Sequence, residues 1–239
     1  MTGGVRFLSA GPLPVLAIIL IIGLVIVLIP LLILGVISLA FTRLGLSWLE
    51  ALALVMLMLV GSFINIPLYR IHRDMVRATP VDNGGNGILV LPRSAMPVWE
   101  TQISVNLGGC IIPVCIAAYL VFQAAVASGS SLIIPVFLSA GIVSVLSFIA
   151  THEITGVGIR VPVLIPALAA LLAGILISGG TGLNAMVVAL AGGVIGTIAG
   201  GNLAHLFRVR DLEVQAVSIG GYGSFGAMFL CCILPALIA

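Results

Sequence analysis

The sequence predicts an all-α fold, a polytopic transmembrane helix bundle of about seven spans with its amino terminus in the cytoplasm and its carboxy terminus outside. Composition is the first observation behind this prediction. Of the 239 residues, 62% are hydrophobic and only 7% are charged, against about 25% charged in a soluble globular protein. The mean hydropathy of +1.38 agrees. We expect residues 1–239 to form one integral membrane domain, with the lipid bilayer as its main partner.

Seven apolar runs are the second observation, because a helix needs roughly 20 apolar residues to cross a bilayer. Strands of a membrane barrel alternate every second residue, whereas the run from Val15 to Leu34 is apolar on every side. Helices must therefore do the spanning. The runs lie near residues 13–40, 47–69, 103–127, 132–151, 161–179, 183–207 and 215–239.

The distribution of arginine is the third observation. With seven spans the connections alternate between the two sides, and eight of the nine arginines then share one side, with Arg43 alone on the other. Short arginine-bearing loops are retained in the cytoplasm. This asymmetry places the amino terminus inside and predicts a multi-pass protein of the inner cell membrane.

The first apolar run is expected to stay in the protein as a helix. Arg6 precedes it, as in a signal peptide, but the run lasts about 28 residues against the 7 to 15 of a cleaved leader. A helix of this length exceeds the hydrocarbon thickness, so we expect it to tilt. Pro30 removes one backbone donor and is the expected kink point.

One polar segment, residues 71–102, separates spans two and three and is predicted to be a cytoplasmic loop. It contains three prolines and the run Asp82–Gly87, which is typical of a turn. A small hairpin, an extended tether and a docking surface for a cytoplasmic protein partner all fit such a loop. The remaining connections are short, so sequential helices should pack as antiparallel neighbours.

The segments Val105–Gly109 and Val217–Gly221 are faintly similar, which hints at an internal repeat. Both stand at the start of helices that enter from the cytoplasm. The sequence alone gives no reason to regard the similarity as more than chance.

Glycines at four-residue spacing predict close helix packing in spans six and seven. Span six carries Gly192, Gly196 and Gly200, and span seven carries Gly220 between Ala216 and Ser224 at the same spacing. In lipid, such small-residue faces let two backbones approach closely, so we pair span six with span seven. Several glycines also weaken the start of span seven, by about 1 kcal/mol each relative to alanine. A partly unwound helix of this kind often supplies a transporter's substrate site.

Polar residues of the membrane region collect towards the cytoplasmic side. We hypothesise a polar pocket that opens to the cytoplasm and binds a small solute or ion, because buried amides and hydroxyls need partners. The alternative is that each residue is wet at the interface or makes an interhelical bond worth roughly 0.6 kcal/mol. The candidate ligand-binding residues are Asn106, Asn202, His205, Tyr222 and Ser224.

The sequence shows no pattern typical of an enzyme, so no catalytic residue is assigned. It has no lysine, no phosphate-binding loop, no nucleophile-elbow serine and no paired-histidine zinc motif. No acidic residue lies in the middle of a span. The four cysteines are interpreted as small apolar residues of the spans, so we expect no metal and no cofactor. No basic run interleaved with aromatics indicates a nucleic-acid partner.

Four motifs occur in an order that resembles the DUF1614 family, prokaryotic multi-pass membrane proteins of unknown function. They are Asn106–Pro113, Gly156–Pro162, Gly196–Leu206 and Gly220–Leu230, and the resemblance covers roughly residues 47–239. The family pattern has an aspartate where this chain has Asn202 and another where it has Gly226. Two adjacent intramembrane aspartates are similar to those of the intramembrane aspartyl proteases, in which one carboxylate acts as base while the other stays protonated. The resemblance thus implies that this chain lacks aspartyl-type hydrolysis.

Three functions therefore remain open. The first is a non-enzymatic transporter or channel for a small solute or ion. The second is a catalytically degenerate relative of an intramembrane aspartyl protease-like family. The third is a non-enzymatic membrane scaffold subunit that docks a partner through the loop at residues 71–102.

Overall fold

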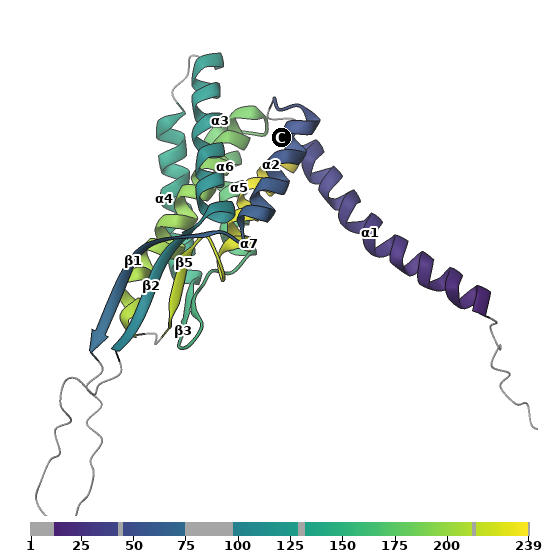
Figure 1. The fold of residues 1–239 in the computed structure, drawn as a ribbon. Coiled ribbons are helices and arrows are strands. Elements are labelled where there is room, and N and C mark those ends of the chain that lie inside the picture. Colours follow the sequence, from purple (N-terminus) through teal and green to yellow (C-terminus); the bar gives the residue numbers. More distant parts are fainter. Residues whose placement is uncertain (1–11, 43–44, 75–97, 129–131, 212–213, 239) are drawn as a thin grey trace, which may run out of the picture.

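The computed structural model describes residues 12–42, 45–74, 98–128, 132–211 and 214–238, and most of them are helical (Figure 1). Successive helices connect at alternate ends of the bundle, so they run in opposite directions, as the short connections predicted. The α-helices are α1 (Pro12–Thr42), α2 (Trp48–Gly61), α3 (Ile112–Ser128), α4 (Ile133–Ala150), α5 (Leu164–Ser178), α6 (Leu183–Gly196) and α7 (Phe225–Ile238).

The predicted class of helical membrane protein is confirmed. Within the described residues, four helical stretches are long and apolar enough to cross a bilayer: Ile19–Leu39, Leu107–Ala127, Ile133–Ala150 and Leu183–Val209. Three shorter apolar helices are α2, α5 and the residues Phe225–Ala236 of α7. With 14 residues, α2 is about 21 Å long, against a hydrocarbon thickness of roughly 30 Å. The count of seven crossings and the sides of the two termini stay predictions.

A small sheet lies at one end of the bundle, which we call the sheet end; the carboxy terminus lies at the opposite end, the far end (Figure 1). Its strands are β1 (Asn65–Asp74), β2 (Val98–Asn106) and β5 (Ala216–Ile219), in the order β1-β2-β5. β1 and β2 are antiparallel, and β2 and β5 are parallel. A second, two-stranded antiparallel sheet joins β3 (His152–Ile154) to β4 (Gly158–Arg160).

The strands correct the predicted ends of three spans. Residues 65–69, 103–106 and 216–219 were expected within spans two, three and seven, but they form β1, β2 and β5. An apolar run has the same hydropathy as a strand and as a helix, so hydropathy alone does not separate the two. The loop predicted at 71–102 begins and ends inside β1 and β2, which form the arms of a hairpin. Its residues 75–97 lie outside the described residues.

The similarity between Val105–Gly109 and Val217–Gly221 has a structural counterpart. β2 continues through the π-helix η2 (Leu107–Ile111) into α3, and β5 continues through the turns at 220–224 into α7. Each unit is a strand, a pair of glycines and a helix. The two strands run in parallel, with Gln102 opposite Ala216 and Val105 opposite Ile219. The chain therefore uses the same local arrangement twice, side by side.

Helix α6 is the centre of the bundle, because residues 185–194 are all buried. α6 packs against α7, as predicted, but the stripe of Gly192, Gly196 and Gly200 packs against α4: a Cβ on any of the three would meet residues 139–144 of α4. The neighbouring Gly193 instead faces Ala170 of α5 and Cys231 of α7. Successive residues are turned by about 100° around a helix axis. The glycine stripe and the adjacent Gly193 therefore contact different helices.

Helix α1 extends away from the bundle (Figure 1). The apolar stretch Ile19–Leu39 is mostly exposed, and contact with the body is made near the carboxy end of the helix, where Ser38 and Phe41 are buried. The helix runs on through Pro30. A long apolar helix with this exposure is suited to lipid contact.

Candidate functional site

The predicted ligand-binding residues fall into three separate groups when their hydrogen bonds are followed. Asn106 belongs to the junction of the sheet with α3, Asn202 to the crossing of α6 and α7, and His205 to a cluster beside α4, while Ser224 is buried in the turn before α7. Tyr222 belongs to none of them, since it is 83% exposed. The single pocket proposed from the sequence is therefore not supported by these contacts.

Asn106 is the centre of the sheet junction and is fully buried. Its Nδ2 donates to the carbonyl of Ser62 at 2.6 Å and to Oδ1 of Asn65 at 3.0 Å. Its Oδ1 accepts from the backbone N–H of Gly109 at 2.8 Å, which caps η2. Both ends of the amide are thus used by the protein. This residue joins α2, β1 and α3, and its role in the structure is architectural.

The junction also explains the paired glycines. A Cβ on Gly109 would meet the carbonyl oxygen of Gly220, and one on Gly220 would lie 2.5 Å from the carbonyl oxygen of Gly109. Gly220 further has φ +74°, a conformation that L side chains rarely adopt. Ser218 lies beside them and donates its hydroxyl to Asn65 Oδ1. Gly220, predicted to pack two helices, instead lies in the turn before α7 and packs on η2.

At the second group, the crossing of α6 and α7, it is α6 that loses α-helical geometry. α6 changes to a π-helix, η3 (Thr197–Asn202), and then to a 3₁₀-helix, η4 (Leu203–Asp211). A π segment often marks a functional site, and a 3₁₀ run longer than 3–4 residues is uncommon. α7 begins only at Phe225, after the turns at 220–224. The predicted unwinding near Gly220 is thus present, at the entrance of the helix.

Polar groups at this crossing are buried and only partly satisfied. The Thr197 hydroxyl donates to the Gly193 carbonyl at 2.7 Å and lies 3.5 Å from Cys231 Sγ of α7. Asn202, 2% exposed, donates from Nδ2 to the Thr197 carbonyl over a long 3.4 Å. Among the described residues, the buried hydroxyl of Ser224 has no hydrogen-bond partner. An unpaired buried hydroxyl costs free energy, so Ser224, in the turn before α7, has capacity for one further hydrogen bond.

Asn202 and Gly226 lie at matching heights of this crossing. α6 and α7 run in opposite directions, and each of the two residues is five positions from the Thr197–Cys231 contact, on the side of the sheet. Gly226 and Gly201, the neighbour of Asn202, also border the segment that links β4 to α5. A Cβ on Gly226 would lie 3.1 Å from Val163 Cγ2, and one on Gly201 would lie 3.0 Å from Val161 Cγ2.

The third group is a cluster of the buried His205, the partly buried Glu153 and the exposed Arg208. His205 Nδ1 lies 2.6 Å from Glu153 Oε1, and Nε2 lies 3.2 Å from the carbonyl oxygen of Phe148. Both ring nitrogens face acceptors, an arrangement that the imidazolium form satisfies fully. Arg208 donates to the same Oε1 at 3.4 Å. The cluster ties η4 to the end of α4 and to β3.

The pairing of Glu153 with His205 was not predicted from the sequence, although both residues follow helices that end on the same side. We expect Glu153→Gln to lower the free energy of unfolding by about 1–2 kcal/mol, because a charge-assisted hydrogen bond becomes a neutral one. Arg208 is 62% exposed, so Arg208→Ala should cost less than about 0.5 kcal/mol. Thermal unfolding of the purified variants in detergent checks both values. Equal losses of stability in the two variants would mean that the hydrogen bond between His205 and Glu153 contributes no more than the exposed Arg208 contact.

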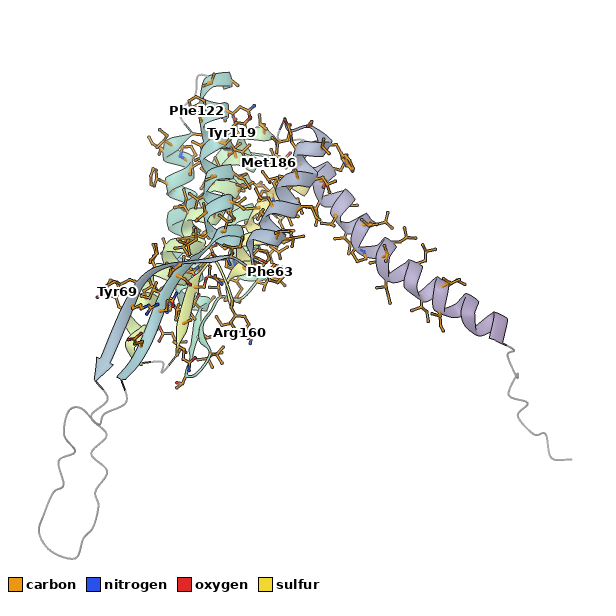
Figure 2. All side chains as sticks on the ribbon, viewed as in Figure 1. Phe63, Tyr69, Tyr119, Phe122, Arg160 and Met186 are labelled. Atoms are coloured by element: carbon orange, nitrogen blue, oxygen red, sulfur yellow. The ribbon has the colours of Figure 1, made fainter. Side chains whose placement is uncertain are left out.

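Tyr222 has an interfacial position instead of the predicted ligand contact. Phe63, Tyr69 and Phe207 are likewise exposed by more than half, and all four lie on elements of the sheet end. Figure 2 labels Phe63 and Tyr69 there, together with Arg160. Aromatic side chains are enriched where a membrane meets water. These residues therefore indicate the level of the bilayer surface at this end.

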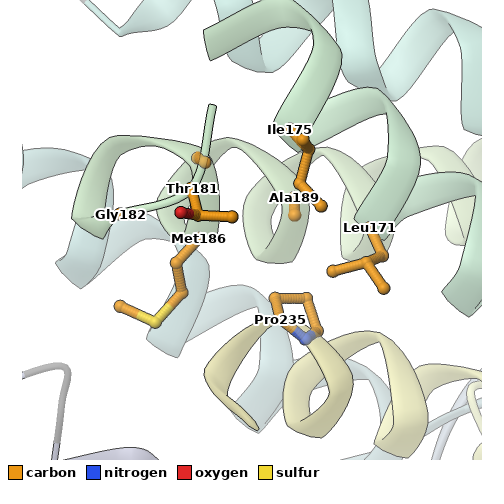
Figure 3. Close-up of a pocket in the computed structure, with 8 residues that line it drawn as sticks. Leu171, Ile175, Thr181, Gly182, Met186, Ala189 and Pro235 are labelled. Carbon is orange, nitrogen blue, oxygen red and sulfur yellow. The ribbon is translucent and has the colours of Figure 1, made fainter. Parts of the chain in front are cut away.

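Two cavities lie at the far end of the bundle. Figure 3 shows the first, between α5, α6 and Pro235 of α7, with a volume of about 10 Å³. That is room for about one water molecule at most. The second, of about 210 Å³, lies between α3, α6 and Gly45. Neither is lined by a residue that the sequence predicted to bind a ligand.

Comparison with known proteins assigns the chain to a family. Residues 59–238 match the family described as "Protein of unknown function (DUF1614)". Searches of curated proteins and of solved structures give no match for this chain. The matched range runs from the end of α2 to the end of α7, and so includes the strand–glycine–helix units and the crossing of α6 and α7. The chain is a mostly helical membrane protein that belongs to the DUF1614 family.

Proposed function

We propose that this protein is a non-enzymatic carrier or channel of the cell membrane for a small polar solute or ion, with its site at the crossing of α6 and α7. The observation that supports the proposal most directly is that α6 changes to a π segment there and α7 begins only after a run of turns, beside buried polar side chains. Interrupted helices at membrane depth are tolerated when they are buried in protein or line a cavity, and they often supply the binding site of transporters.

The depth of the crossing fits this role. The regular part of α6 has 14 residues, so the π segment begins about 21 Å from the far end of the helix, inside a hydrocarbon layer of roughly 30 Å. The site therefore lies within the bilayer but nearer the sheet end. A solute that reaches it from the sheet end has only a short path, which agrees with a pocket that opens to the cytoplasm.

The chemistry of the site limits what it can hold. It offers the Asn202 amide, the hydroxyls of Thr197 and Ser224 and backbone carbonyls freed by the helix breaks, and no carboxylate of the described residues lies on η3 or α7. Neutral oxygen and amide groups suit an uncharged polar molecule or a monovalent cation. The charged cluster of His205 lies further along the same chain segment, towards the sheet end.

Purified protein in liposomes tests the proposal with four defined probes: K⁺, Na⁺, urea and glycerol. We expect at least one probe to enter faster than in protein-free liposomes. Asn202→Leu removes the amide without changing the fold class and should slow that flux by at least about tenfold, because a lost hydrogen bond to a buried polar group costs more than 1 kcal/mol. Asn184→Leu is the matched control, since Asn184 is exposed on the same helix and should transport at the original rate.

Two results would contradict the proposal. The first is an entry rate no higher than in protein-free liposomes for every probe. The second is an unchanged rate in Asn202→Leu, which would place the pathway elsewhere. Circular dichroism of each variant before reconstitution separates a lost site from a lost fold.

A second candidate function, a catalytically degenerate relative of an intramembrane aspartyl protease-like family, is favoured by one observation. Asn202 and Gly226 lie at matching heights on antiparallel helices beside Val161–Val163. These are the two positions where the family resemblance implies aspartates, and two carboxylates share a proton only when they are in close contact. An amide and a glycine have no such chemistry. Cleavage of a transmembrane peptide by the unmodified protein, blocked by an aspartyl protease inhibitor, would instead show an active enzyme.

A further inference from the structure

The larger cavity at the far end is separate from the proposed transport site. Its volume is about 210 Å³. One wall is a single face of α3, with Leu120, Gln123, Ala124 and Ala127 at helical spacing, and the others are Leu183 and Val187 of α6 and Gly45 of the α1–α2 connection. Leu120 and Val187 are buried and form its inner end, whereas Gln123 and Leu183 are exposed and form its mouth.

The lining selects an apolar ligand. Apart from the Gln123 amide, its side chains are hydrocarbon, and a buried water needs two to four polar partners. A dry cavity of roughly 150 Å³ with a similar lining binds benzene, so this larger one has room for several methylene groups. An occupant is therefore a hydrocarbon with at most one polar group, placed at the mouth where Gln123 stands.

The surroundings identify that hydrocarbon. Gln123 is five residues from the end of α3 at Ser128, which is about 8 Å along the helix and close to the boundary between headgroups and chains. The neighbouring Phe122 and Val126 are 69% and 70% exposed, on the apolar outer surface of the bundle. Figure 2 shows Phe122 and Tyr119 at this end of α3. Hydrocarbon chains that reach such a mouth are those of the bilayer lipids themselves.

We propose that the cavity between α3, α6 and Gly45 binds one acyl chain of a phospholipid, whose ester carbonyl accepts a hydrogen bond from the Gln123 amide. The bound chain fills the space between the α1–α2 connection and the bundle. It thereby fastens that connection to α3 and α6, and the protein is more stable with the lipid than without it.

The test uses the full-length protein, purified in detergent and stripped of lipid. Dioleoyl phosphatidylglycerol, dioleoyl phosphatidylcholine and dodecane are added in separate titrations, and the unfolding temperature is followed. Both phospholipids should raise it to the same extent, because the chain and not the headgroup is held. Dodecane, which has the chain but no ester, should bind more weakly.

Ala124→Phe fills the cavity and should abolish the response to all three ligands. Ala118→Phe is the control on the exposed, opposite face of α3 and should respond like the original protein. Gln123→Leu keeps the cavity and should weaken phospholipid binding about fivefold, the effect of one hydrogen bond, while dodecane binding is unchanged. This second variant keeps the test valid if Ala124→Phe does not fold.

Three outcomes would overturn the proposal. One is an equal phospholipid response in Ala124→Phe and Ala118→Phe, which would locate the lipid elsewhere. Another is a response to dodecane with none to either phospholipid, which would indicate a site for small apolar solutes. The third is an equal loss of phospholipid and dodecane binding in Gln123→Leu, which would show that Gln123 does not contact the ester group. The transport proposal is unaffected by each, since Asn202, the residue on which it depends, lies at the other end of the helices.

Discussion

Gly200→Ala is expected to be the most damaging single-methyl change at the centre of the bundle. The added Cβ would meet the backbone carbonyl of Ser144, and that carbonyl belongs to α4 and cannot rotate away. Relief requires the two helices to separate, which also removes the close packing at Gly196. Overpacking typically costs 1–3 kcal/mol, occasionally more, and we expect at least about 3 kcal/mol here because backbone must move.

Two other glycine variants serve as comparisons for Gly200→Ala. Gly192→Ala meets the Ser139 side chain first, which has some freedom to move, so its loss should be smaller. Gly141→Ala, on α4, meets no heavy atom within 4 Å and should be neutral or stabilising by up to about 1 kcal/mol, the difference in helix propensity. The measurement is thermal unfolding in detergent, followed by circular dichroism.

The expected order of stability is Gly141→Ala above Gly192→Ala above Gly200→Ala. An unfolding temperature of Gly200→Ala equal to that of Gly141→Ala would show that α4 and α6 are not in the close contact described. If Gly200→Ala alone is not expressed, Gly192→Ala can still be compared with Gly141→Ala. The test is then whether Gly192→Ala unfolds at a lower temperature than Gly141→Ala.

Asn106→Ala is expected to have the second large effect. The change leaves the carbonyl of Ser62 and the N–H of Gly109 without the partners that they have at 2.6 and 2.8 Å. Each buried unpaired group costs about 1–3 kcal/mol, so the loss should be about 2–5 kcal/mol. Thermal unfolding in detergent measures it, with Asn184→Ala as the exposed control within about 0.5 kcal/mol of the original protein.

Asn106→Asp separates a hydrogen-bond role from a packing role, because the side chain keeps its size. One carboxyl oxygen would still accept from Gly109, but the other would face the Ser62 carbonyl, which is also an acceptor. We expect a loss as large as that of Asn106→Ala. Stability close to the original in both variants would remove Asn106 from its place as the link between α2, β1 and α3.

Much of the helical part of the fold could be predicted because hydropathy reports it directly. The runs at 132–151 and 161–179 correspond closely to α4 and α5, and the short connections gave the alternating helix directions. The strands were missed because their apolar residues continue the helical runs without a change in hydropathy. The Asp82–Gly87 turn did suggest a hairpin, but nothing in the sequence showed that its arms reach back to Asn65 and forward to Asn106.

The candidate site was predicted less well, since polar residues at similar depth need not be close. Asn106, Asn202 and His205 all lie near the sheet end, as expected, but their partners come from different elements. The pairing of His205 with Glu153 depends on η4 folding back onto α4, which has no local sequence signal. The glycine stripe was recognised, but its partner was not, because spacing along one helix does not say which neighbour lies beside it.

The sequence by itself determined that this chain is a helical membrane protein of the DUF1614 family, because hydropathy and motif order are properties of the chain alone. Tertiary structure decided which side chains share a site. Contacts such as Gly200 with Ser144 and Gly109 with Gly220 join residues far apart in the chain. Their geometry depends on how all the helices pack together, which a one-dimensional pattern does not contain.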